Sequence, residues 1–533
     1  MAIYIRTEDI KLEEIPKLYV EMQQDKACVE SLKSTSPVII IGSRGVGKSF
    51  LLRLAQYEQL ESFSEERVFP VYTTLRKSSL IHTSDSQQFY HWMLARICHD
   101  ILRSLRQKGL IHTLTSSISM LTGESDNNIE KTAIELIMEA YENSWQNPAE
   151  NIDISALPTI DNFVESIEDL CQTLNIDRIN LLIDEAAHVF IPSQQRQFFT
   201  LFRDMRSPYL TVNAAVYPGV TIYGDTFQAS HDATMIDLHR DITDKDYINA
   251  MRELVKKQSD SDTMNQISQN RSNFAILAYS CGGNPRHLLK TIMQTGKLNS
   301  NNVNTTIREY YRSEIWAEHS QLSEKYAGLR PIIDWGRNFI EEKVLPEISS
   351  KNIKFIEDGI TSSYFWIHRD APQLVNEALR ILEYTGIISG HSQGIKASRS
   401  NIGTRYCVNF GCLLSLEDRA TARGTAIAEK LSIKRMTEFG MNNGAFDSLI
   451  KSGISDKQID LSIQLKSQME KSIDILDLTP WQKDKLHGEN LNTIDDVLRA
   501  SESDIMNAYY VGDVRARQMK NSAYAAIYEY LAG

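Results

Sequence analysis

The chain has 533 residues, which is too long for one hydrophobic core and predicts several domains. Hydrophobic residues make up 42% and charged residues 24%, the balance of an ordinary globular protein, and no apolar run is long enough to span a bilayer. A formal net charge of −12 excludes a protein that coats nucleic acid through bulk positive charge, but not a local DNA-binding module. The charged N-terminal stretch and the absence of any C-x-x-C pair predict a cytoplasmic protein with free thiols.

The first chemical motif lies in residues 38–54, VIIIGSRGVGKSFLLRL, where an apolar strand is followed by a glycine-rich turn and an apolar helix. The segment fits G-x-x-x-x-G-K-S, in which backbone N–H groups surround a phosphate at the N-terminus of a helix. In this pattern Lys48 contacts the outer phosphates and the Ser49 hydroxyl binds Mg²⁺. The motif therefore predicts a site for ATP and Mg²⁺. The predicted phosphate-binding residues are Gly42, Ser43, Arg44, Gly45, Val46, Gly47, Lys48, Ser49 and Phe50.

A second motif follows another apolar segment, RINLLIDEAAHVF, at residues 178–190. Asp184 and Glu185 stand where the predicted strand ends. An aspartate at this position can hold the Mg²⁺ ion, and the next glutamate can polarise a water molecule that attacks the terminal phosphate. The two acids together predict hydrolysis as well as binding, with Lys48 and Glu185 as catalytic residues.

These two motifs resemble those of AAA+ ATPases, especially the initiator-like (origin-recognition) and STAND branches, over about residues 20–300. The resemblance implies an α/β fold with a P-loop parallel sheet and a helical lid. Within that fold, RVFPVYTTLR (67–76) is similar to the second strand, and ATMIDLHR (233–240) is predicted to form a further strand.

The resemblance also implies two sensor residues. YLTVNAAVYPG (209–219) is similar to the sensor-1 strand, with Tyr217 at the expected depth and Asn213 on the same face. CGGNPRHLLK (281–290) is similar to the turn into the sensor-2 helix, which implies that Arg286 reaches over the nucleotide.

One feature of the family is missing from the sequence. Its arginine finger usually lies just before the strand predicted at 233–240, but GDTFQASHDAT (224–234) contains no arginine. Arg203, Arg206 and Arg240 are nearby substitutes, although each is more typical of an ordinary surface charge. Hydrolysis completed by a neighbouring subunit is therefore less firmly indicated than nucleotide binding.

Residues 371–410 resemble a winged helix: an amphipathic helix, a short strand, a polar tip and a return strand. Lys396, Arg399 and Arg405 lie in the predicted wing and suit phosphate contacts, and Arg380 on the preceding helix could face a DNA groove. Winged helices also serve as protein–protein spacers, so both roles stay open.

The C-terminal segment is similar to paired helix-hairpin-helix modules, since residues 510–516, YVGDVRA, match the hairpin. Gly512 allows the tight turn, and the hairpin residues predicted to contact DNA are Gly512, Val514, Arg515 and Arg517. Residues 470–533 hold seven Lys/Arg and eleven Asp/Glu, which argues against tight DNA binding by this module alone. Protein docking is the alternative.

The predicted architecture is an α/β P-loop sheet with a helical lid, then a winged-helix domain and an all-α C-terminal helix-hairpin-helix domain. Its domains are a core at 1–242, a lid at 243–300, a winged-helix-like domain at 301–420, a helical linker at 421–469 and the helix-hairpin-helix domain at 470–533. The predicted function is ATP binding and hydrolysis coupled to DNA binding or homo-oligomeric assembly, for which the resemblance suggests a setting in prokaryotic antiviral defence. The alternative is a STAND-like switch that retains nucleotide and docks an effector protein with little turnover.

Overall fold

The structure is a computed structural model. It describes residues 3–77, 81, 86–111, 132–143, 152–186, 192–224, 226–325, 329–396, 402–451 and 469–532. Among these residues, no helix combines the length and the apolar character that crossing a membrane requires.

A five-stranded parallel sheet forms the core of the N-terminal half, in the order β2-β3-β4-β1-β5. Its strands are β1 (Val38–Ile41), β2 (Val68–Thr74), β3 (Arg178–Asp184), β4 (Leu210–Val216) and β5 (Thr234–Asp237). Every residue of β3 and β4 is buried, as a parallel sheet covered on both faces requires. Because all strands run the same way, the loop after β1 and the acids that end β3 meet at the same edge of the sheet. The predicted α/β P-loop fold is confirmed.

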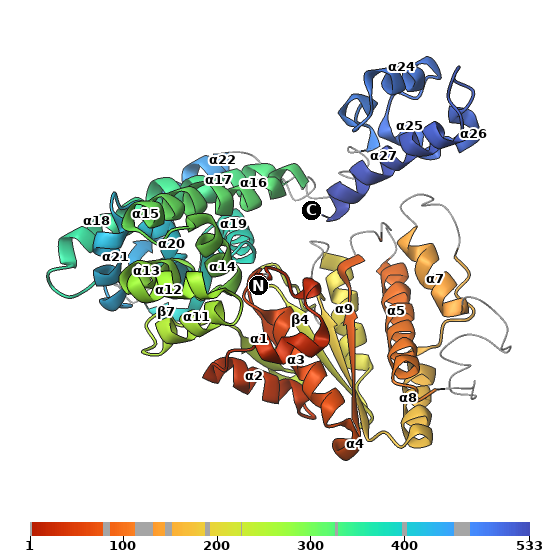
Figure 1. The fold of residues 1–533 in the computed structure, drawn as a ribbon, viewed down its shortest axis with the longest axis horizontal. Helices are drawn as coiled ribbons and strands as arrows, with labels where there is room; N and C mark the ends of the chain where they lie inside the picture. Colours follow the sequence, from red (N-terminus) through yellow and green to blue (C-terminus); the bar gives the residue numbers. More distant parts are fainter. Residues whose placement is uncertain are drawn as a thin grey trace.

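Helices cover both faces of this sheet (Figure 1). The alternation of β1 shows the two faces, because Val38 and Ile40 pack in one apolar cluster and Ile39 in the other. The first face carries α1 (Ile15–Leu18), α2 (Gln23–Lys33) and α3 (Lys48–Glu61), and the second carries α4 (Phe63–Glu66), α5 (Ser86–Gln107), α7 (Ala133–Glu142), α8 (Ile160–Leu174) and α9 (Pro192–Asp204). Short helices η1 (Thr7–Asp9), η2 (Leu12–Glu14) and α10 (Ala229–Asp232) complete this half.

A helical lid follows β5. It consists of α11 (Tyr247–Lys256), α12 (Ser261–Gln269), α13 (Arg271–Ser280) and α14 (Pro285–Thr295). The start of α14 is fixed by its sequence: Pro285 occupies the first turn, and the Asn284 side chain accepts hydrogen bonds from the N–H groups of Arg286 and His287.

The next region combines helices with a second sheet in the order β7-β8-β6-β9. Its helices are α15 (Ser300–Glu309), η4 (Tyr310–Glu314), α16 (Ile315–Lys325), α17 (Arg330–Phe339), η6 (Ile340–Val344), α18 (Leu345–Phe355), α19 (Gln373–Tyr384), α20 (Phe410–Leu414), α21 (Ala420–Glu429), η7 (Gly444–Phe446) and α22 (Asp447–Lys451). Its strands are β6 (Tyr364–His368), β7 (Ile388–Lys396), β8 (Ile402–Val408) and β9 (Thr437–Phe439). The order β6, α19 and the antiparallel hairpin β7–β8 agrees with the expected winged helix.

Two features of this region differ from the predicted domain organisation. Strand β9 lies in the segment that was expected to be a helical linker and pairs in parallel with β6. A strand of three residues is too short to give a period-two signal, so tertiary pairing decided it. In addition, one buried apolar cluster runs from Tyr247 to Leu449, with no break at residue 300 or 420.

The C-terminal module has its own apolar core, built around Leu486, Val497, Ile505, Ala516 and Met519. Its helices are η9 (Ile473–Ile475), α24 (Pro480–Gly488), α25 (Ile494–Arg499), α26 (Glu502–Ile505) and α27 (Asp513–Ala532). As predicted, Thr493 caps α25, in a capping box with Asp496. Figure 1 shows these helices as a cluster of their own at the end of the chain.

Candidate nucleotide-binding site

The loop after β1 has the backbone shape that a phosphate cradle needs. Gly45 and Gly47 adopt φ angles of 83° and 104°, which residues with a Cβ atom rarely adopt. Within the described residues, the N–H groups of these two glycines have no acceptor. A side chain at position 45 would also not fit, because a Cβ atom there would lie 2.8 Å from the Cβ of Arg286. The loop therefore presents free donors beside the first turn of the lid helix α14.

Lys48 begins α3 and is only 7% exposed. Its ammonium donates to the carbonyl oxygens of Gly42 and Ser43 and lies 4.1 Å from the centre of the Tyr217 ring. Burial lowers the pKa of Lys48 to about 7, although the nearby carboxylate of Asp184 opposes the shift. A phosphate at the loop would favour the charged form, so the position suits an anionic ligand.

Asp184 ends β3 with its carboxylate held at both oxygens. Oδ2 accepts a hydrogen bond of 2.7 Å from the hydroxyl of Tyr72, and Oδ1 accepts one of 2.9 Å from the N–H of Glu185. Tyr72 lies on β2, which pairs with β3 in parallel. No pattern along the chain pointed to Tyr72, because its role depends on which strand lies beside β3.

Glu185 follows in a left-handed conformation with φ of 55°. Its Oε2 atom is buried and has no hydrogen-bond partner in the described part of the chain. Burial, and then the negative charge of Asp184, raise the pKa of Glu185 to about 7. An unpaired buried carboxylate oxygen costs free energy unless a water or ligand donates to it, so this atom marks a place for a bound molecule.

Asn284 connects the lid to the loop, and Arg286 connects it to the N-terminal segment. The Asn284 amide donates 2.7 Å to the carbonyl oxygen of Arg44, and Arg286 Nε donates 3.3 Å to that of Ile5. The sequence Asn284–Pro285 predicts the start of a helix. The contact of Asn284 with the loop could not be predicted from the sequence. A cavity of 770 Å³ brings some of the predicted residues together, but Asp184 is not among the residues that line it. It is lined by Arg44, Gly45, Gly47, Lys48, Ser49, Phe50, Glu185, Tyr217 and Arg286, among others.

The chemistry of this donor set fits ATP with Mg²⁺. The loop offers free N–H groups, a buried lysine and a helix N-terminus for phosphates. The Ser49 hydroxyl and the Asp184 carboxylate are oxygen ligands of the kind that Mg²⁺ takes.

Asn213 lies away from this cavity, contrary to the prediction. Its amide is fully buried in β4: Oδ1 accepts from the N–H of Val38 at 2.8 Å, and Nδ2 donates to Asn180 Oδ1 at 2.7 Å and to the carbonyl oxygen of Leu32. Helix α2 covers the side chain of Asn213, because Leu32 belongs to that helix. Asn213 thus holds the sheet to α2.

The substitute arginine fingers all have partners within the chain. Arg240 is 7% exposed, pairs with Asp25 at 2.8 Å and donates to the carbonyl oxygens of Val46 and Gly283. Arg203 pairs with the neighbouring Asp204 and donates to the carbonyl oxygen of Thr226, and Arg206 lies 3.8 Å from Asp232. Arg240 therefore joins the loop, the lid and α2, which no pattern along the chain indicated.

A family model described as ORC-CDC6-like matches residues 4–355, which is more than half of the chain. This chain belongs to the ORC-CDC6-like family. It is a nucleotide-binding AAA+ ATPase, in agreement with the strand order of its sheet.

Three solved structures resemble this ORC-CDC6-like ATPase, each over 80% of its chain. The first is a Walker-type ATPase of Pyrococcus abyssi, with 13% identity, 98% of that chain covered and a TM-score of 0.36. The second is the ORC1 protein of Aeropyrum pernix in complex with DNA, with 13% identity, 94% of that chain covered and a TM-score of 0.32. The third is the ORC2 protein of Aeropyrum pernix in ADPNP–ADP complexes, with 9% identity, 96% of that chain covered and a TM-score of 0.35. These values are low, so the assignment depends on the family match. No curated protein sequence gives a significant match.

The winged-helix region of the ORC-CDC6-like chain packs directly on the P-loop. A Cβ atom on Gly386, in the turn after α19, would lie 3.2 Å from the Ser43 hydroxyl. The Tyr384 ring of α19 lies 5.0 Å from the Tyr217 ring, between ring centres. Arg44 of the loop forms an ion pair of 3.1 Å with Glu318 of α16. Neither Tyr384 nor Glu318 carried a sequence signal, because these contacts join elements that lie far apart along the chain.

Arg380 was a predicted groove-facing residue, but the structure places its guanidinium against the ATPase half. Its Nε donates to the carbonyl oxygen of Gly219, after β4, and its guanidinium pairs with Glu377. The ATPase half therefore covers this part of α19.

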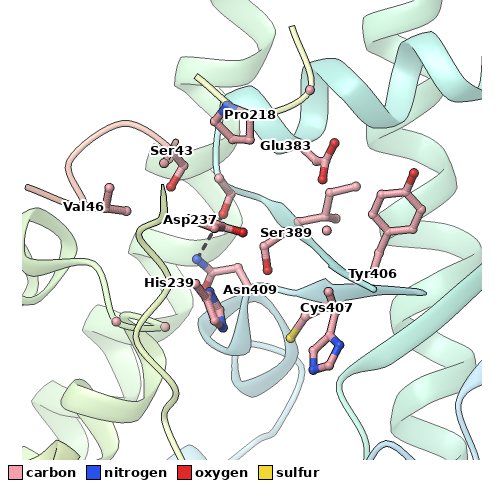
Figure 2. A pocket seen from close by; sticks show the side chains of 18 of the residues that line it. Ser43, Val46, Pro218, Asp237, His239, Glu383, Ser389, Tyr406, Cys407 and Asn409 are labelled. Atoms are coloured by element: carbon pink, nitrogen blue, oxygen red, sulfur yellow. Dashed lines mark hydrogen bonds between the residues drawn. The ribbon is translucent and has the colours of Figure 1, made fainter. Parts of the chain in front are cut away.

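A second cavity of 670 Å³ lies on the other side of the loop, between the ATPase core and the second sheet. Figure 2 shows Ser43, Asp237 and Glu383 among the residues that line it, together with Tyr406 and Cys407 of β8. Burial raises the pKa of Glu383 to about 7. Of the predicted phosphate-binding residues, Gly42, Ser43 and Val46 line this cavity, so the loop forms the wall between the two spaces.

The residues predicted to contact DNA differ in their exposure to solvent. Lys396 is exposed at the end of β7, but Arg405 is 8% exposed and its guanidinium contacts His391 and Ser392, so its placement contradicts a DNA contact. Its guanidinium is enclosed by side chains of β7, the strand that pairs with β8. Arg399 lies outside the described residues. In the hairpin, Gly512, Val514, Arg515 and Arg517 are all exposed, and Arg517 pairs with Glu502 at 3.4 Å.

Proposed function

We propose that the chain binds ATP with Mg²⁺ and hydrolyses it through the residues of the 770 Å³ cavity. Lys48 binds the outer phosphates, the hydroxyl of Ser49 and the carboxylate of Asp184 hold Mg²⁺, and Arg286 contacts the nucleotide from the lid. Mg²⁺ neutralises the phosphate charge when it is bound. Glu185 accepts the proton of the attacking water, and Tyr217 positions Lys48.

One observation carries this proposal. The buried Oε2 of Glu185 has no partner among the described residues, and it shares a cavity with Lys48 and Ser49. A carboxylate with a pKa of about 7 is suited to general-base chemistry near neutral pH.

The test is Glu185→Gln, with turnover and ATP affinity measured together. We expect turnover to fall about 100-fold, the usual contribution of a general base, while ATP still binds. Glu65→Gln is the matched control, because Glu65 is an exposed acid on α4. Unchanged turnover in Glu185→Gln would remove Glu185 from the mechanism.

We further propose that the nucleotide state controls DNA binding and homo-oligomeric assembly. The contacts Ser43–Gly386, Arg44–Glu318 and Tyr217–Tyr384 support this, since they join the loop to the winged-helix region. The residues proposed at DNA are Lys396, Gly512, Val514, Arg515 and Arg517. The test measures turnover with and without duplex DNA, and mass by light scattering with ADP, ATP and DNA. ATP-dependent mass or DNA-dependent turnover supports the coupling.

A second candidate is a STAND-like switch that holds nucleotide and docks an effector protein. The pairing of Arg203, Arg206 and Arg240 within the chain favours it, because no described candidate is free to act on a neighbouring site. Constant monomer mass and negligible turnover in the same experiments would favour this switch over the motor.

A further inference from the structure

The C-terminal module exposes an unusual amount of apolar surface. Six of the twelve large hydrophobic side chains that are exposed in the described residues fall within 475–514. The aromatic members of that set are all here: Trp481, Tyr509 and Tyr510, with exposed fractions of 39%, 73% and 71%. Single exposed apolar residues need no explanation, but a cluster marks an interaction site. We call Trp481, Tyr509 and Tyr510 the aromatic patch.

Two cations are built into the aromatic patch. Lys485 Nζ lies 5.6 Å from the centre of the Trp481 ring and 5.9 Å from that of Tyr509. The guanidinium carbon of Arg515 lies 5.0 Å from the Trp481 ring, and Arg515 Nη1 donates 2.7 Å to the carbonyl oxygen of Tyr510. The patch therefore joins α24, the hairpin and the start of α27 into one surface.

This combination of groups favours unpaired nucleotides over other partners. Aromatic faces stack on bases of any sequence, and adjacent cations contact the phosphates between them. A duplex keeps its base faces inside the stack, so it offers nothing to exposed rings. The centre of a protein interface is depleted in charged groups, whereas here the ammonium of Lys485 lies close to two of the rings. The backbone is also open at Gly512, where an added Cβ atom would meet nothing within 4 Å.

We infer that the aromatic patch binds single-stranded nucleic acid, with bases stacked on Trp481, Tyr509 and Tyr510 and phosphates held by Lys485 and Arg515. This rests on the proposed function, in that the chain contacts DNA, and names the form of nucleic acid that its C-terminal module takes. Because residues 470–533 are net negative, stacking and not bulk charge supplies the affinity. The salt dependence of single-strand binding is therefore shallow.

The test uses the full chain and fluorescence anisotropy with a labelled oligothymidine strand and with a duplex of the same length. The double variant Tyr509→Ala and Tyr510→Ala removes two stacking rings. It is expected to weaken single-strand binding at least about tenfold, the loss of at least one stacked base, and to leave duplex binding within about twofold. Tyr509→Phe and Tyr510→Phe keep the rings and are expected to bind as the unaltered chain does. Met441→Ala is the control for loss of an exposed apolar side chain outside the patch.

The outcomes separate this inference from the function on which it rests. If the alanine variant keeps its single-strand affinity, or if both nucleic acids lose affinity equally, the inference is overturned and DNA binding stands. If the unaltered chain binds neither the single strand nor the duplex, the proposed DNA contact and this inference are both wrong. If only an ATP-dependent rise in mass is lost in the alanine variant, the patch is a self-association surface and the inference is overturned.

Discussion

The ammonium of Lys48 lies 4.1 Å from the centre of the Tyr217 ring, in contact with the π face. The same ring lies 5.0 Å from that of Tyr384 on α19, so one tyrosine separates the P-loop lysine from the winged-helix region. A phosphate that draws Lys48 out of this contact changes the surroundings of Tyr217. Tyr217 therefore contacts both the P-loop lysine and the winged-helix region.

The first prediction concerns Lys48 itself. Lys48→Ala removes the buried cation beside the loop, so we expect ATP binding to disappear in a calorimetric titration with millimolar ATP. Lys26→Ala is the control, because Lys26 is an exposed lysine paired with Glu21. Unaltered ATP affinity in Lys48→Ala would mean that the loop does not bind phosphate.

The second prediction concerns the pH dependence of stability without nucleotide. Folding raises the pKa of Glu185 from about 4.5 to about 7, so the folded state holds a proton that the unfolded state has lost between these values. The contribution of Glu185 to the free energy of unfolding is therefore largest below pH 4.5 and decreases as the pH rises towards 7. The total decrease is about 1.4 kcal/mol for each unit of pKa shift.

A glutamine side chain at this position is neutral at every pH, so Glu185→Gln should raise the melting temperature more at about pH 8 than at about pH 5. Thermal melts of both proteins at the two pH values measure this difference, with Glu65→Gln as control. Equal effects at both pH values would show that the Glu185 carboxylate is not desolvated.

A third prediction addresses the ion pair between Arg44 and Glu318. At 3.1 Å, and with both side chains partly exposed, it contributes at most about 1 kcal/mol to stability. Glu318→Gln removes a negative charge beside the phosphate site and frees Arg44, so we expect ATP affinity to rise about threefold to fivefold at low salt. The control is Glu324→Gln, an exposed acid of the same helix. Equal or weaker ATP binding in Glu318→Gln contradicts the prediction.

The fourth prediction separates a structural arginine from an arginine finger. Arg240→Ala leaves Asp25 buried without its partner, which costs about 3–5 kcal/mol. We expect a lower melting temperature and weaker ATP binding, because the guanidinium also holds the carbonyl oxygens of Val46 and Gly283. If stability and binding are unchanged and only turnover is lost, Arg240 is a finger after all.

The local chemistry of the protein could be read from the order of its residues. A motif such as the P-loop must keep its residues in sequence along the chain, so Gly45, Gly47, Lys48 and Ser49 were readable from their spacing. The acids that end β3 were readable because a buried strand has an apolar run with a clear end. Thr493 was readable as a cap because its partner Asp496 lies three residues away.

The side chains that reach this chemistry from elsewhere became visible only in the folded chain. Tyr72 meets Asp184, Asp25 meets Arg240 and Glu318 meets Arg44 across 112 to 274 positions of the chain. Burial was equally hidden: Asn213 and Arg405 look like functional polar residues along the chain, yet each is enclosed by elements that lie far away in sequence. Residue spacing records contacts within an element, whereas contacts between elements follow from how strands and domains pack.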